Sequence, residues 1–212
     1  MNTSMALKSL LGVGALMLPL LASAESNVQT GAATASPGAT AHLDFSIVIP
    51  KVLYLRVGSG SAYTSGILAS VNTTDLITFS PAAGTVGNGT AVAGTGGDLT
   101  GGVETAAILS NSGNVTLNAT ASGALSDGTG DSIPFTQITT AATALTSATQ
   151  LSPPTLTNAT SSNVILTAPA TKLIVQDAKW TYSFANSTNV PAGTYGGVNA
   201  NNSRVTYTAT MP

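Results

Sequence analysis

A period-two alternation of apolar and polar residues is the feature that most constrains the fold of this chain. Residues 204–211 place an apolar or aromatic side chain at every second position, with threonines between them. Residues 172–184 repeat the pattern, with Trp180, Tyr182 and Phe184 on one face. Successive side chains of a strand point to opposite faces, so this spacing predicts strands buried on one side.

Shorter segments with the same character precede these two. The first is 41–49, in which Leu43, Phe45, Ile47 and Ile49 share a face and Pro50 ends the run. Further strands are predicted over residues 51–57, 75–79, 103–109, 115–121 and 164–168.

Turn and loop signals separate these strands. Asn111-Ser112-Gly113 predicts a hairpin between residues 103–109 and 115–121. Residues 82–102 and 139–161 are rich in Gly or in Thr, Ala and Ser, and we expect long loops there. Many short strands joined by such turns favour an all-β, immunoglobulin-like, two-sheet antiparallel sandwich with long Gly/Thr-rich loops. A closed barrel is the alternative.

Composition agrees with strands and argues against disorder. Only 7% of residues are charged and 43% are hydrophobic, so the surface-helix formers Glu, Lys and Arg are scarce. Disordered chains combine low hydrophobicity with high net charge, whereas the formal net charge here is −2.

The N-terminus predicts export. Residues 1–24 read as a signal peptide: Lys8 gives a positive start, residues 10–21 are apolar, and Ala22-Ser23-Ala24 is a small-residue cleavage site. Residues 25–40 are small and polar, which predicts a flexible arm, and residues 41–212 are expected to form a single β-sandwich domain. We therefore expect an extracytoplasmic protein, secreted or at the cell surface, with the periplasm as the alternative.

Several classes of function are excluded or disfavoured. The chain has no cysteine, which removes disulfides, thiol nucleophiles and thiolate metal sites. After the signal peptide, five cationic side chains face eight carboxylates, so the basic patch that nucleic-acid binding requires is missing. No later apolar run approaches the roughly 20 residues that span a bilayer, so we expect no transmembrane segment in the mature chain.

Candidate catalytic groups are few. His42 is the single histidine, and beside Asp44 it is most simply a polar-face residue of a strand. Asp98 with Glu104, and Asp127 with Asp131, are the nearest approach to the paired carboxylates of glycoside hydrolysis. Both pairs lie in Gly-rich segments, where Asp commonly bonds its own turn. We expect no enzyme.

Residues 127–131 (DGTGD) also offer oxygen ligands to a hard cation. Asp127 and Asp131 are therefore candidate calcium ligands, although the loop lacks the spacing of an EF-hand. No other cofactor is expected.

Aromatic residues gather toward the C-terminus. Trp180, Tyr182, Tyr195 and Tyr207 are candidates for ligand binding or assembly, for example as a platform for sugars. An aromatic stripe on one strand face is more often part of a core, and both interpretations remain open.

The chain resembles poorly characterised secreted β-sandwich proteins of Gram-negative bacteria. The resemblance rests on residues 45–58 (FSIVIPKVLYLRVG), 179–186 (KWTYSFAN), 191–195 (PAGTY) and 204–212 (RVTYTATMP). More loosely, the ending is similar to WxL-type surface domains and fimbrial subunits. It departs from WxL domains because Tyr207 stands where a second Trp would be, and it lacks the cysteine pair of many fimbrial subunits.

The resemblance implies an extracytoplasmic structural or adhesive role and brings no catalytic residues. We therefore expect a non-enzymatic, fimbrial-type cell-surface protein that assembles with itself or with other surface subunits by β-strand addition. Residues 41–49 and 204–211 are the segments expected to exchange. The alternative is a soluble secreted or periplasmic carbohydrate-binding module with glycans as partners.

Overall fold

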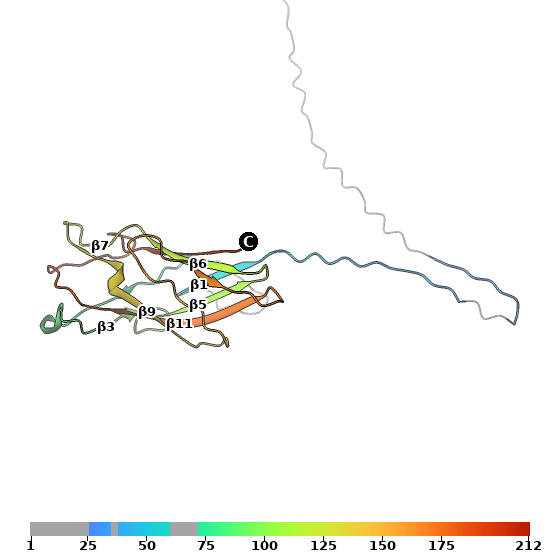
Figure 1. The fold of residues 1–212 in the computed structure, drawn as a ribbon, viewed down its shortest axis with the longest axis horizontal. Coiled ribbons are helices and arrows are strands. Elements are labelled where there is room, and N and C mark those ends of the chain that lie inside the picture. The colour runs from blue at the N-terminus through green and yellow to red at the C-terminus, as the bar shows by residue number, and fades with distance from the viewer. Residues whose placement is uncertain (1–25, 35–37, 60–71) are drawn as a thin grey trace, which may run out of the picture. The chain divides into compact units, whose positions relative to one another are not determined.

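The computed structural model describes residues 26–34, 38–59 and 72–212 of the chain (Figure 1). It divides into two units, Met1–Ile49 and Pro50–Pro212. The predicted signal peptide lies outside the described residues. The described part is all-β, with two short 3-10 turns, η1 (Ala83–Thr85) and η2 (Phe135–Gln137).

The larger sheet has five strands and is antiparallel throughout. Its centre is β11, the longest strand, which pairs with β5 along one side and with β9 along the other. β1 pairs with the outer edge of β5. β3 pairs with the last two residues of β11, on the same side of β11 as β5. The strands are β1 (Leu53–Val57), β3 (Val92–Ala93), β5 (Val103–Ser110), β9 (Ile138–Thr143) and β11 (Ile174–Phe184).

The second sheet has three antiparallel strands in the order β10-β6-β12. Two small antiparallel pairs, β2 with β4 and β7 with β8, stand apart from both larger sheets. The strands are β2 (Ile77–Thr78), β4 (Thr95–Gly96), β6 (Val115–Ala121), β7 (Leu125–Ser126), β8 (Ser132–Ile133), β10 (Val164–Leu166) and β12 (Val205–Thr210).

One hydrophobic core takes alternate residues from both larger sheets. Ile108 of β5, Leu117 of β6 and Trp180 of β11 are each at most 1% exposed. Their neighbours along each strand are more exposed, which is the consequence of the period-two pattern. The two sheets therefore stabilise each other by burying the faces that the sequence alternation predicts.

The predicted all-β class is confirmed, and most predicted strands lie where expected. β6 has the predicted bounds, and β11 and β12 lie within the predicted ranges. The Thr/Ala-rich segment predicted as a loop, residues 139–161, contains all but the first residue of β9, and residues 82–102 contain the short strands β3 and β4.

The predicted hairpin at residues 111–113 is wrong. β5 belongs to the five-stranded sheet and β6 to the three-stranded sheet, so the turn carries the chain from one sheet to the other. Alternation and turn residues are the same for a hairpin and for such a crossing, which is why the sequence did not distinguish them.

The predicted strand over residues 41–49 is also wrong. These residues have no regular secondary structure, and none of the described strands pairs with them. A strand requires a hydrogen-bonded neighbour and a surface that covers its apolar face. The alternation shows only that the segment has an apolar face. The large apolar side chains are exposed instead, from 70% for Leu43 to 89% for Val48.

Within the described residues, no helix is long and apolar enough to cross a membrane.

Candidate functional site

The aromatic residues proposed as a platform are mostly core residues. Trp180 is fully buried, and its indole Nε1 donates to the Leu151 carbonyl oxygen at 2.7 Å. Its ring lies 5.4 Å from that of Tyr207, between centroids. Tyr182 is 6% exposed, and its hydroxyl lies 2.9 Å from the Tyr207 hydroxyl. Trp180 and Tyr182 are therefore core residues, whereas Tyr207 is partly buried against them.

Burial also fixes the protonation of the two tyrosines. It raises the pKa of Tyr182 well above its usual range, and the neighbouring Tyr207 adds to the shift. Burial raises the pKa of Tyr207 to about 12. Both hydroxyls stay protonated at physiological pH and form a neutral hydrogen bond between the two sheets.

Tyr195 lies apart from this group, beside the turn between β7 and β8. Its hydroxyl donates to the Pro191 carbonyl oxygen at 2.9 Å. Gly193, two residues earlier, lies against both the Tyr195 ring and the side chain of Asp127. The four aromatic candidates therefore do not form one site.

The candidate calcium loop is an Asp-stabilised turn. Asp127 Oδ1 accepts the backbone N–H groups of Thr129, Gly130 and Asp131 at 2.8, 3.1 and 3.0 Å. The hydroxyl of Thr129 donates to Oδ2, and these bonds hold the pKa of Asp127 below its usual value. Among the described residues, no group of three His, Cys, Asp or Glu side chains could hold a metal ion. The turn accounts for Asp127 without a cation.

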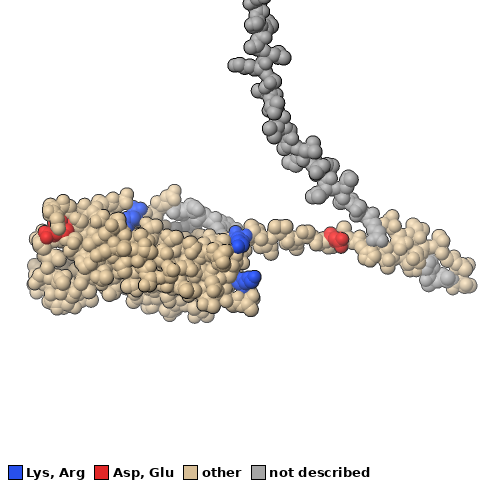
Figure 2. All heavy atoms as spheres, turned by 45° about the horizontal axis from the view of Figure 1, so that its top comes forward, with Lys and Arg blue, Asp and Glu red and all other residues tan. Residues whose placement is uncertain are grey.

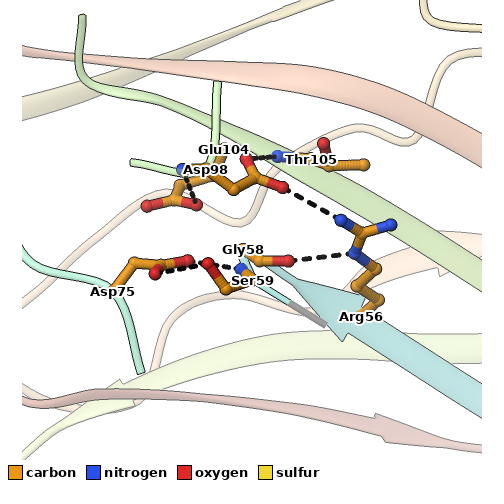
Figure 3. Close-up of polar contacts among 7 residues, drawn as sticks. All are labelled: Arg56, Gly58, Ser59, Asp75, Asp98, Glu104 and Thr105. Carbon is orange, nitrogen blue, oxygen red and sulfur yellow. Dashed lines mark hydrogen bonds and ion pairs between the residues drawn. The ribbon is translucent and has the colours of Figure 1, made fainter. Parts of the chain in front are cut away.

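The structure does bring Asp98 and Glu104 together, in a cluster that the sequence did not predict (Figure 3). Asp98 N–H donates to Glu104 Oε2 at 3.2 Å, and Asp98 Oδ1 accepts from Thr105 N at 2.7 Å. Arg56 Nη2 forms an ion pair with Asp98 Oδ2 at 3.0 Å, and its Nε donates to the Gly58 carbonyl oxygen at 2.9 Å.

A third carboxylate, Asp75, completes this cluster. It accepts from the backbone and from the hydroxyl of Ser59, the latter at 2.6 Å. Gly58 lies between the acids with φ of +81°, and a Cβ there would lie 2.5 Å from Asp75 Oδ2 and 2.8 Å from Glu104 Oε2. Both the backbone angle and the space therefore require glycine at this position.

Glu104 has the most perturbed pKa in the cluster. The side chain is 4% exposed, and this burial, followed by the negative charges of Asp75 and Asp98, raises its pKa to about 7. Asp75 behaves oppositely, because the hydrogen bonds from Ser59 outweigh burial and hold its pKa below the usual value. Protonation of Glu104 relieves the repulsion among three acids that share one Arg.

The geometry favours a structural role for this cluster. It joins the end of β1, the residues before β2 and the turn between β4 and β5, and its central acid is buried. In a glycoside hydrolase the two carboxyl groups flank the bond to be cleaved, which requires access to both.

The described surface also contains a shallow pocket of about 250 Å³ on the larger sheet. Tyr54 and Arg56 of β1 and Gln176 of β11 line it, together with Thr146 of the loop after β9. Asp177 anchors that loop by accepting from Thr146 N and Ser147 N, both at 2.8 Å.

The remaining sequence feature of functional interest is the exposed segment 41–49. Phe45 and Ile47 are each 85% exposed and Ile49 is 77% exposed. Burying one such side chain typically stabilises a protein by about 1.5–3 kcal/mol. Charged side chains are sparse on the face of the molecule in Figure 2, so charge does little there to discourage association.

Comparison with protein-family models, with curated proteins and with solved structures gives no match. Family membership therefore adds nothing to the geometry, and the function has to be argued from the residues.

Proposed function

We propose that this chain is an exported, non-enzymatic structural or adhesive protein of the fimbrial type, which assembles at the cell surface by β-strand addition. Residues 41–49 are the added strand in this proposal. The compact unit, Pro50–Pro212, supplies the sheet that receives it and is an immunoglobulin-like two-sheet sandwich.

The exposure of 41–49 carries the proposal. The segment combines alternation of polar and apolar residues over 42–47, five exposed large apolar side chains and a position directly before the compact unit. Contiguous exposed apolar surface on a soluble protein marks an interaction site or an aggregation liability. Alternation selects a strand as the form in which this segment binds, because only a strand places Leu43, Phe45 and Ile47 on one face.

The edges of the two larger sheets support the proposal. β9 (ITTAAT) and β12 (VTYTAT) are six-residue edge strands without charge, Pro or Gly. Natural proteins usually protect edges with charged residues, Pro or bulges, because an open edge is a template for another strand. This chain therefore has both an exposed apolar segment that can add as a strand and unprotected edges that can receive one.

Location at the cell surface rests on the signal peptide read from residues 1–24. Protein sequencing of the exported chain is expected to begin at Glu25, and labelling of intact cells is expected to reach it. Free protein in the periplasm or the medium is the alternative.

Sedimentation velocity over a range of protein concentrations tests the assembly. We expect the exported protein to form species larger than a monomer, and Phe45→Asp to abolish them because a charge then faces an apolar surface. Ser46→Asp is the matched control: it adds the same charge to the opposite face and should assemble. A protein that stays monomeric at every concentration and is absent from the cell surface would contradict the proposal.

A second candidate is a secreted or periplasmic carbohydrate-binding module, and the shallow pocket at Tyr54 favours it. An aromatic ring beside Arg56 and Gln176 suits the apolar face and hydroxyl groups of a sugar. A glycan array compared between the native protein and Gln176→Ala tests it, and no binding by the native protein would remove it.

A further inference from the structure

The two open edges differ in which backbone groups they present. On β6, Ala121 N donates to Ala159 O at 3.2 Å and Ala119 O accepts from Ser161 N at 2.8 Å. The backbone N–H and C=O groups of Ala119 and Ala121 therefore point away from β12. N–H and C=O alternate in direction along a strand, so β12 pairs with β6 through its threonines. Among the described strands, nothing pairs with the other side of β12, where Val205, Tyr207 and Ala209 direct their N–H and C=O groups.

The same reasoning applies to β1. Gly58 N donates to Thr105 O at 2.8 Å and Asn111 N donates to Val52 O at 3.3 Å, which places the even-numbered residues on the β5 side. Leu53, Leu55 and Val57 therefore direct their backbone groups to the outer edge of β1.

These two edges lie on one flank of the compact unit. β1 and β12 are in contact, and Lys51 Nζ donates to the Pro212 carbonyl oxygen at 2.9 Å. Figure 1 shows the C-terminus beside the start of β1. The flank carries apolar side chains that are only partly buried: Leu53, Leu55, Val57, Val205, Tyr207, Ala209 and Met211.

The edge at β9 is less apolar. Its core-facing positions are Ile138, Thr140 and Ala142, and the Thr140 hydroxyl is buried with no hydrogen-bond partner among the described residues. A polar Thr140 between Ile138 and Ala142 gives this edge less apolar surface for an added strand. Apolar complementarity therefore favours the flank between β1 and β12.

We infer that residues 41–49 of one copy add to the free edge of β12 in a second copy, with Leu43, Phe45 and Ile47 packed over the flank between β12 and β1. This inference rests on the proposed function and names its acceptor. Main-chain hydrogen bonds to Val205, Tyr207 and Ala209 fix the strand, and the half-buried side chains of the flank select its apolar face.

The acceptor is a different surface from the donor, so the contact is heterologous. Each copy that receives a strand still has its own segment 41–49 to donate, and the assembly grows as an open chain unless it closes into a ring. Asn111 fixes the residues that lead into β1: its Oδ1 accepts from Val52 N and its Nδ2 donates to Pro50 O, both at 2.8 Å.

Proline substitutions at the two edges test the acceptor on the full chain. Ala209→Pro removes an N–H that points to the free edge of β12 and leaves the bonds to β6 intact, as edge strands tolerate. Ala142→Pro is the matched control, because it removes the equivalent outward N–H of β9. By sedimentation velocity, we expect at least a tenfold loss of self-association for Ala209→Pro and none for Ala142→Pro.

Cysteine pairing gives a second readout that does not depend on proline being tolerated. The native chain has no cysteine, so a Ser46→Cys protein can be mixed with a Thr206→Cys or a Thr208→Cys protein under oxidising conditions. Opposed residues of paired strands lie within disulfide reach, so a cross-linked dimer is expected. Ser46→Cys mixed with Ala141→Cys, on the outer face of β9, should not cross-link.

The outcomes separate the acceptor from the function. Three results of the proline test would overturn the β12 acceptor: assembly that survives Ala209→Pro, assembly that is lost with Ala142→Pro alone, and assembly that is lost equally with both. Cross-linking of Ser46→Cys to Ala141→Cys alone would overturn it as well. Each of these results leaves strand addition itself in place. A native chain that never assembles overturns the proposed function as well.

Discussion

Residues 41–49 and β11 carry nearly the same alternation and have opposite surroundings. In β11, Trp180 is fully buried between two paired neighbours, whereas Phe45 is 85% exposed. The sequence pattern is a property of one strand, but burial depends on a partner elsewhere. The comparison teaches that alternation reports which face a segment will bury, and leaves open whether the partner belongs to the same chain.

The largest expected effect tests the buried half of this comparison. Trp180→Ala removes the largest fully buried side chain and a hydrogen bond to Leu151. We expect the free energy of unfolding to fall by about 3–5 kcal/mol, measured by urea denaturation with circular dichroism. A loss below about 1 kcal/mol would mean that β11 does not organise the core.

The next effect concerns pH and the carboxyl cluster. The pKa of Glu104 rises from 4.5 to about 7 on folding, so between these values the folded protein holds a proton that the unfolded chain releases. Stability is therefore greatest below pH 4.5 for this group and falls as pH rises through 7. Between pH 5 and 8 we expect a loss of about 2–3 kcal/mol.

Glu104→Gln is the control for that prediction. Gln has the shape of the protonated acid and accepts the same N–H from Asp98, so the slope between pH 5 and 8 should disappear. Urea denaturation followed by Trp180 fluorescence at both pH values measures it. An unchanged slope would assign the pH dependence to another group.

A smaller effect is expected where the two sheets meet through their tyrosines. Tyr207→Phe keeps the ring beside Trp180 and removes the hydroxyl that pairs with Tyr182 at 2.9 Å. The buried Tyr182 hydroxyl then lacks a partner, and we expect a loss of about 1–2 kcal/mol in urea denaturation. No change would indicate that water replaces the missing hydroxyl.

The smallest effect on unfolding tests the exposed half of the comparison. Phe45→Ala should change the unfolding free energy of Pro50–Pro212 by less than about 0.5 kcal/mol at low protein concentration, because the side chain is exposed. Urea denaturation of the dilute full chain measures it. A loss above about 1 kcal/mol would show that the segment packs on its own chain.

The sequence predicted the all-β class and most strands because alternation is local. β9 was missed because Thr and Ala give little contrast between its two faces, and its burial comes from β11. The carboxyl cluster was missed for a related reason. Asp98 and Glu104 are close in sequence, but Arg56 is 42 residues from Asp98, and Glu104 acquires its raised pKa only from the packing that joins them.

The Asn111 side chain has a mechanical consequence. A pull on the chain at Ile49 reaches the compact unit through Pro50 and Val52, both of which Asn111 ties to the end of β5. The hydrogen bonds between β1 and β5 run perpendicular to the strands, so tension along β1 loads them together in shear instead of opening them one after another. A load applied along β1 would therefore be shared among the β1–β5 hydrogen bonds.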